Sequence, residues 1–273
     1  MLSATICVLA AIVAGFIFLE KYVEKVVPIS QKTAILELVS APTWVNQSLK
    51  EKIYLAAIAN GEDLRIDEDA AQSIQHNIQT LFPWIDKPQV QTTHNSIRIK
   101  GKWRKPLGLI KVGWRKLYVD ANLVVLDYIP IPNLPIVKIN GLSPIASIPE
   151  TGKVWQRDDL AAAIAILAKL DQMDQLVTPH NPLLCEIASI DVSNFNGRVD
   201  NQAPHIILYA KDNTEIIWGA EIGTWHRYLE ATDEEKLAAL YSYYKKHGSL
   251  LNKAKYINLR HPQNYIPLPV DRY

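Results

Sequence analysis

Cysteine is scarce in this chain of 273 residues. Its two cysteines, Cys7 and Cys185, lie in segments of very different character, one strongly apolar and one within the main body of the chain. A disulfide bond needs Cα atoms within about 7 Å of each other, and we expect none between these two residues. The cysteine content therefore neither requires nor excludes an oxidising compartment.

Motifs that bind phosphate, activate a serine or hold zinc are also missing. Neither G-x-x-x-x-G-K-[ST] nor G-x-G-x-x-G occurs, and there is no G-x-S-x-G turn. The seven histidines lie far apart, never at helical spacing with a glutamate. Asp158-Asp159 and Glu234-Glu235 fall at predicted helix starts, where the helix dipole favours carboxylates. The sequence predicts no catalytic residue, no metal site, no cofactor and no small-molecule substrate, which indicates a protein that is not an enzyme.

Acidic residues are absent between Asp86 and Asp120, and the part of this interval from 98 to 116 holds eight basic ones: Arg98, Lys100, Lys102, Arg104, Lys105, Lys111, Arg115 and Lys116. Such a run is typical of a solvated hairpin face opposite a buried Ile/Leu/Val face. It also suggests contact with an anionic surface, either lipid head groups or cell-wall polymer such as peptidoglycan. The candidate residues for that contact are Lys100, Lys102, Arg104 and Lys105. Because the net charge is only +1, we expect no nucleic-acid partner.

Charge is absent from Leu2–Leu19, an apolar run of a length that would rise about 27 Å as a helix. The run predicts a transmembrane helix. A cleaved signal peptide is the competing interpretation, but no Lys or Arg precedes the run, and its small residues lie inside it. Few basic residues flank the run, so charge alone leaves its orientation open.

Periodicity after the apolar run predicts an α+β fold. Strand-like alternation at 34–39 is followed by two helices, near 47–59 and 68–82, and then by three or four strands between 97 and 126. The second half combines helices near 159–173 and 233–247 with strands at 186–192, 205–210, 214–218 and 255–260. Thr232 and Glu235 form a capping box before the last helix, and Gly248 ends it.

Proline marks the predicted division of the chain. Three prolines fall within Ile129–Pro135, which indicates a stiff connector. We expect a membrane anchor at 1–20, a linker at 21–33, a first domain at 34–128, a connector at 129–136 and a second domain at 137–273. The second domain is expected to hold an open, mostly antiparallel sheet.

Three stretches resemble the bacterial cell-division family FtsQ, called DivIB in Gram-positive bacteria. Gly61–Ile85 is similar to the glycine, hydrophobic-Asp, helix and "PW-hydrophobic" pattern of its POTRA domain. Ile97–Leu126 resembles the paired strands that follow, and Ala254–Pro262 resembles the closing "hydrophobic-D-L-R-Y" strand of the family's β domain. Two residues depart from the family pattern. Asn258 occupies the aspartate position of the closing-strand motif, and Asn122 lies near the usual glycine of the hairpin within Ile97–Leu126.

The resemblance implies a single-pass protein of the inner (plasma) membrane at the division septum. Its N-terminus would be cytoplasmic, and a POTRA domain (β-α-α-β-β) and a β domain would lie in the periplasm or outside the cell. It also implies a non-enzymatic scaffold whose β domain binds the partner pair FtsB and FtsL.

An edge strand offers unpaired N–H and C=O groups to which a partner strand can add. The residues expected to make that contact are Tyr256, Arg260, His261, Asn264 and Tyr265. Core packing of Tyr256 and an internal salt bridge of Arg260 are the alternatives. Two other functions stay open: a POTRA-type chaperone or scaffold of envelope and outer-membrane biogenesis, and a membrane-anchored cell-wall hydrolase.

Overall fold

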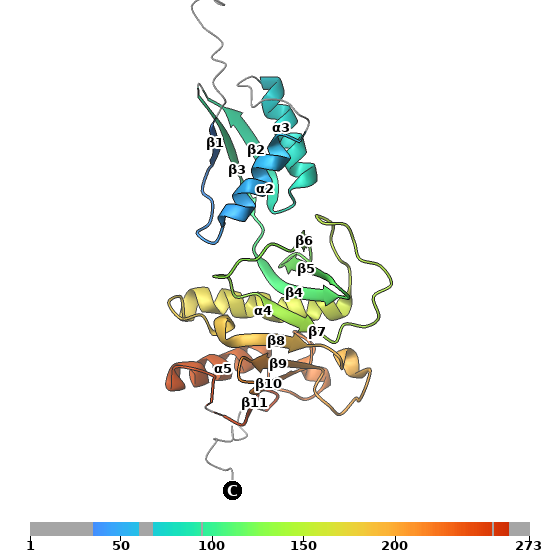
Figure 1. Ribbon diagram of the computed structural model, residues 1–273. Helices are drawn as coiled ribbons and strands as arrows, with labels where there is room; N and C mark the ends of the chain where they lie inside the picture. The colour runs from blue at the N-terminus through green and yellow to red at the C-terminus, as the bar shows by residue number, and fades with distance from the viewer. Residues whose placement is uncertain (1–34, 60–67, 94, 253, 262–273) are drawn as a thin grey trace, which may run out of the picture.

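The computed structural model describes residues 35–59, 68–93, 95–252 and 254–261. They form two sheets joined end to end in an elongated molecule (Figure 1). A three-stranded sheet with two helices occupies one end, and an eight-stranded sheet with two long helices extends to the other end. The content is therefore mixed α+β with large sheets.

The transmembrane part of the expected fold class needs correction. No helix in the described ranges is both long and apolar enough to cross a membrane. The longest, α4 (Asp158–Val177), has sufficient length but carries five charged residues, among them Asp171 and Asp174. The apolar run Leu2–Leu19 and the linker at 21–33 lie outside the described residues.

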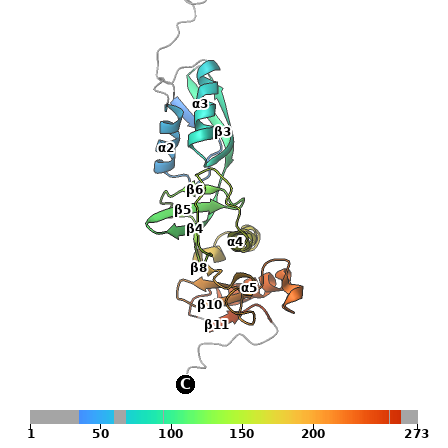
Figure 2. The same cartoon turned by 90° about the vertical axis from the view of Figure 1, so that its right-hand side faces the viewer.

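The first unit follows the order β-α-α-β-β: β1 (Ile35–Leu38), α2 (Gln47–Ala57), α3 (Glu68–Leu81), β2 (Ile85–Thr92) and β3 (Ser96–Trp103). In space β3 is central, parallel to β1 and antiparallel to β2. The two helices cover one face of this sheet (Figure 2). A buried core joins the layers, including Leu49, Ile53, Ile78, Trp84, Ile97 and Ile99.

Helix α2 shows how local sequence sets an element of this unit. The side chain of Asn46 accepts a hydrogen bond from the N–H of Leu49 at 3.0 Å, which caps the first turn. The helix buries Leu49, Ile53, Ala56 and Ala57, the apolar face that the sequence predicts. Each large side chain buried in this way stabilises the fold by roughly 1.5–3 kcal/mol.

The eight-stranded sheet has the order β11-β10-β9-β8-β7-β4-β5-β6. Its strands are β4 (Pro106–Val112), β5 (Arg115–Asp120), β6 (Val125–Asp127), β7 (Val137–Asn140), β8 (Ile187–Asp191), β9 (Ile206–Ala210), β10 (Glu215–Gly219) and β11 (Tyr256–Asn258). The pairs β4–β7, β7–β8 and β10–β11 are parallel, and the other four neighbouring pairs are antiparallel.

The expected boundary at 129–136 also needs correction. The two sheets separate between Trp103 and Pro106, so β4, β5 and β6 pair with the second unit rather than the first. Period-two alternation identifies a strand without saying which sheet it joins. The segment 129–136 is not a free connector either, because Ile129 and Ile131 are buried in the core of the first unit.

Helices α4 and α5 (Asp233–His247) lie on the same side of the eight-stranded sheet (Figure 2). The capping box of Thr232 and Glu235 is confirmed, as is Gly248, which takes a left-handed conformation (φ +71°) at the end of α5. Helix α4 is longer than the helix predicted near 159–173, and Asp158 is its first residue. Arg157 precedes the helix without a side-chain cap, and Asp159 instead accepts hydrogen bonds from Ser143 and Arg157.

Candidate functional site

Strand β11 is the last strand of the eight-stranded sheet, at the end of the molecule farthest from β1 (Figure 1). The N–H of Leu259 donates to the carbonyl of Ile217 in β10 at 2.9 Å. Successive residues of a strand direct their backbone groups to opposite sides, so Ile257 and Leu259 face β10. The N–H and C=O groups of Tyr256 and Asn258 consequently face the outer edge.

The outer edge is open over a shorter length than the sequence suggests. At its far end the carbonyl of Arg260 accepts a hydrogen bond from the N–H of Ala231 at 2.8 Å. The N–H of Arg260 donates to the side-chain oxygen of Asn258 at 3.1 Å. Within the described part of the chain, the segment available to a partner strand is therefore Tyr256–Asn258.

Arg260 belongs to an internal ion network. Its Nε lies 2.7 Å from Oε1 of Glu230, whose other carboxylate oxygen lies 2.7 Å from Nζ of Lys236. Lys236 is fully buried and the side chain of Glu230 is 3% exposed. The network ties β11 to α5, so Arg260 holds the fold together instead of presenting a free guanidinium to a partner carboxylate. The internal salt bridge considered as an alternative is the arrangement found.

Gly219 at the end of β10 makes room for this network. Its φ is +94°, and an added Cβ would lie 2.2 Å from Oε2 of Glu230. The next N–H, from Ala220, donates to that same oxygen at 2.9 Å. A side chain at position 219 would displace the buried carboxylate.

The other predicted partner-binding residues fall into two groups. Tyr256 and His261 are exposed, as a contact role requires. Tyr256 is therefore not a core residue, in contrast to Ile257 and Leu259, which are fully buried. Asn264 and Tyr265 lie outside the described residues.

The four residues predicted to contact an anionic surface differ in exposure and in their partners. Lys100 and Lys102 are exposed on β3. Arg104 instead bridges Asp86 in β2 and Asp120 in β5 at 2.6 and 3.1 Å, and Lys105 pairs with Asp171 in α4 at 2.5 Å. These bridges lie where the two units meet, so Arg104 and Lys105 join the sheets.

Chemically reactive groups are few in the described residues. No cluster of three His, Cys, Asp or Glu side chains there could hold a metal ion. Burial raises the pKa of the Cys185 thiol, which lowers its thiolate fraction although the residue is exposed. Burial tends to raise the pKa of Glu221, but hydrogen bonds from backbone N–H groups and the nearby His205 lower it overall. His205, packed against Tyr228, is itself buried.

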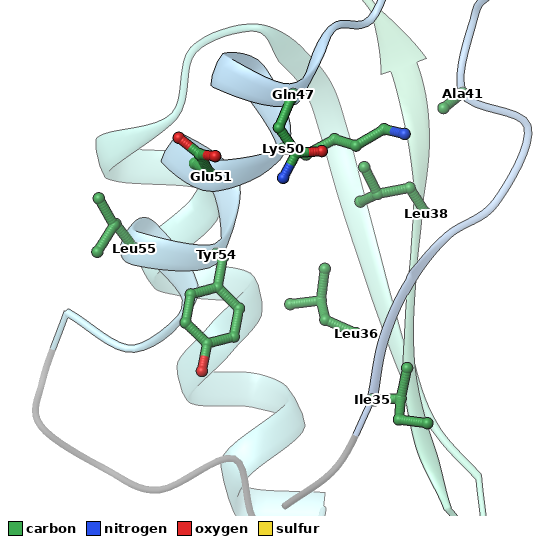
Figure 3. A pocket seen from close by; sticks show the side chains of 9 residues that line it. All are labelled: Ile35, Leu36, Leu38, Ala41, Gln47, Lys50, Glu51, Tyr54 and Leu55. Carbon is green, nitrogen blue, oxygen red and sulfur yellow. The ribbon is translucent and has the colours of Figure 1, made fainter.

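Sequence reasoning missed a groove between β1 and α2 (Figure 3). Its volume is about 750 Å³, and its lining residues are Ile35, Leu36, Leu38, Ala41, Gln47, Lys50, Glu51, Tyr54 and Leu55. We call it the β1–α2 groove. The signal that could have revealed it is the pair Tyr54-Leu55, two apolar residues of α2 that lie outside its buried face.

No family model matches this chain, and no curated protein sequence matches it.

Proposed function

We propose that the chain is a non-enzymatic scaffold that captures a partner strand at the outer edge of β11. The role is the one that the FtsQ and DivIB resemblance implies, in the bacterial division complex with FtsB-like and FtsL-like partners. The observation that supports it is the pair of outward-facing peptide groups at Tyr256 and Asn258 in a terminal strand. Strand addition recognises backbone groups and leaves specificity to the flanking side chains.

Rigid packing behind the outer edge of β11 suits this strand to the capture of a partner strand. Ile257 and Leu259 are fully buried, and Arg260 is held by the carboxylate of Glu230. The outward groups are therefore already ordered, which lowers the entropy lost when a partner strand adds. Tyr256 and the exposed His261 flank the open segment and would contact the partner's side chains.

The test separates backbone pairing from side-chain contact. Tyr256→Pro removes the outward N–H at the first position of the strand, where proline is tolerated, and the ladder with β10 is kept. Tyr256→Thr removes the same ring but retains the N–H. We expect partner capture by the full chain to weaken about tenfold more with proline than with threonine, because hydrogen bonds to the edge are lost. Equal capture by the two variants at equal unfolding midpoints would reject the site.

The place of action belongs to the same proposal. The two sheet units act outside the cytoplasmic membrane, at the division septum. A fluorescent fusion of the full chain is expected to gather at midcell before constriction begins. An even signal around the cell periphery would argue against a role in division.

A further inference from the structure

The β1–α2 groove lies on the first unit, at the opposite end of the molecule from β11 (Figures 1 and 3). We propose that it is a second docking site, which takes an extended segment of another protein as an added strand on β1. The segment presents alternating apolar side chains followed by an acidic residue. This inference does not depend on the function proposed for β11, since it uses a different sheet.

The backbone of β1 calls for an extended partner. The N–H of Ile35 donates to the carbonyl of Asn95 at 3.3 Å, and the N–H of Val39 donates to the carbonyl of Ile99 at 2.9 Å. Ile35 and Val39 therefore face β3. Because successive residues of a strand direct their backbone groups to opposite sides, the N–H and C=O groups of Leu36 and Leu38 point away from β3. Among the described residues none pairs with that outer edge. An added strand satisfies these groups at the spacing of the sheet.

The groove beside this edge is apolar where the partner's side chains would enter. Figure 3 shows Leu36 and Leu38 projecting from β1 toward α2, with the Tyr54 ring between the two elements. Ile35 is 64% exposed, Leu55 62% and Tyr54 41%. Apolar area of this kind next to unpaired backbone groups favours a strand with apolar residues at alternate positions.

Charge at one end of the groove indicates how the partner segment ends. The Lys50 side chain extends toward Leu38 and Ala41 (Figure 3). No described acidic residue forms a salt bridge with Lys50, whereas its neighbour Lys52 pairs with Asp127. An acidic residue of the partner would complement the Lys50 ammonium at this end.

The test uses the full chain and a short blocked peptide in which valine alternates with threonine before a final aspartate. Its binding is measured by fluorescence anisotropy. Methylation of alternate peptide nitrogens is expected to weaken binding about tenfold, because it removes donors but keeps the apolar surface. We expect a loss of similar size, about tenfold, from Tyr54→Glu, which places a charge in the groove. Ser48→Glu, an exposed site on the same helix that does not line the groove, should leave binding unchanged.

Charge reversal tests the acidic end. Lys50→Glu is expected to weaken the aspartate peptide about fivefold and to favour a peptide that ends in lysine. Tyr256→Pro should not alter binding of the peptide, which separates this site from the one on β11.

The proposal is overturned if no peptide binds up to about 1 mM, or if N-methylation has no effect on binding. It is also overturned if a photo-crosslinker at position 54 reacts with residues 1–34 of the same chain, because the chain would then fill its own groove.

Discussion

Glu230→Gln is expected to destabilise the fold by about 3–5 kcal/mol, because it leaves the ammonium of Lys236 buried without a counter-charge. The carboxylate of Glu230 lies 2.7 Å from both Lys236 and Arg260, and it accepts a further hydrogen bond from the N–H of Ala220. Apart from this carboxylate, the ring of Trp218 lies near the ammonium, 5.5 Å away. A ring face replaces little of a lost ion pair. Urea unfolding of the full chain measures the loss.

Two further variants show whether charge is the cause. Glu234→Gln removes an exposed carboxylate from α5, the helix that carries Lys236, and should change the free energy of unfolding by less than about 0.5 kcal/mol. Adding Lys236→Met to Glu230→Gln removes the stranded ammonium and should recover part of the stability. The loss of unfolding free energy in the double variant is compared with the losses in Glu230→Gln and Lys236→Met alone. If the double variant loses as much as the two single variants together, lost packing rather than buried charge explains the effect. Hydrogen exchange at β11 should quicken in Glu230→Gln, since Arg260 loses its anchor.

Asp159→Asn is expected to cost about 2–4 kcal/mol at neutral pH, since the Asp159 carboxylate organises the start of α4. Its side chain is 3% exposed and accepts hydrogen bonds from the N–H and the hydroxyl of Ser143, both at 2.8 Å. The guanidinium groups of Arg157 and Arg198 lie 3.0 and 3.3 Å from the same oxygen. An amide at position 159 would leave the two guanidinium groups facing each other without a negative charge.

The stability lost in Asp159→Asn should become smaller as the pH falls into the acid range. Burial alone would raise the pKa of Asp159, but hydrogen bonds from Arg157 and Ser143 outweigh burial, and the net pKa lies well below its ordinary value. The ionised form therefore stabilises the folded chain above the pKa of the unfolded chain, near pH 4, and this contribution fades as the pH falls further. The gap in unfolding free energy between the natural chain and Asp159→Asn should narrow from about pH 6 to pH 3.

The matched control for this prediction is Asp158→Asn. Asp158 is exposed in the first turn of the same helix, and no described basic residue pairs with it. It should cost only about 0.3–1 kcal/mol through the helix dipole, with no comparable acid dependence. If the difference in unfolding free energy between the natural chain and Asp159→Asn stays constant across the acid range, the shape of the side chain and not its charge explains the effect of this substitution.

Most helices and strands could be predicted from the sequence because capping and apolar spacing depend on residues close together in the chain. The capping box at Thr232 and Glu235 and the buried face of α2 each depend on residues within a few turns of one another. Arg260 illustrates the limit of such reasoning. Its partner Glu230 lies 30 residues away in the sequence, and no spacing rule connects an edge strand to the loop before α5.

The sequence by itself determined the helices of the first unit, the apolar face of α2 and the ends of α5, since these follow from periodicity and capping, but it missed β2 and the full length of α4. Only the tertiary structure decided which sheet each strand joins, because an apolar pattern marks β3 and β4 as strands without naming their partners, and β3 stays in the first sheet whereas β4 begins the second. It likewise decided that Arg104 and Lys105 join two units whereas Lys100 and Lys102 face solvent. Pairing partners and counter-charges are set by contacts between residues distant along the chain, and composition carries no record of those contacts.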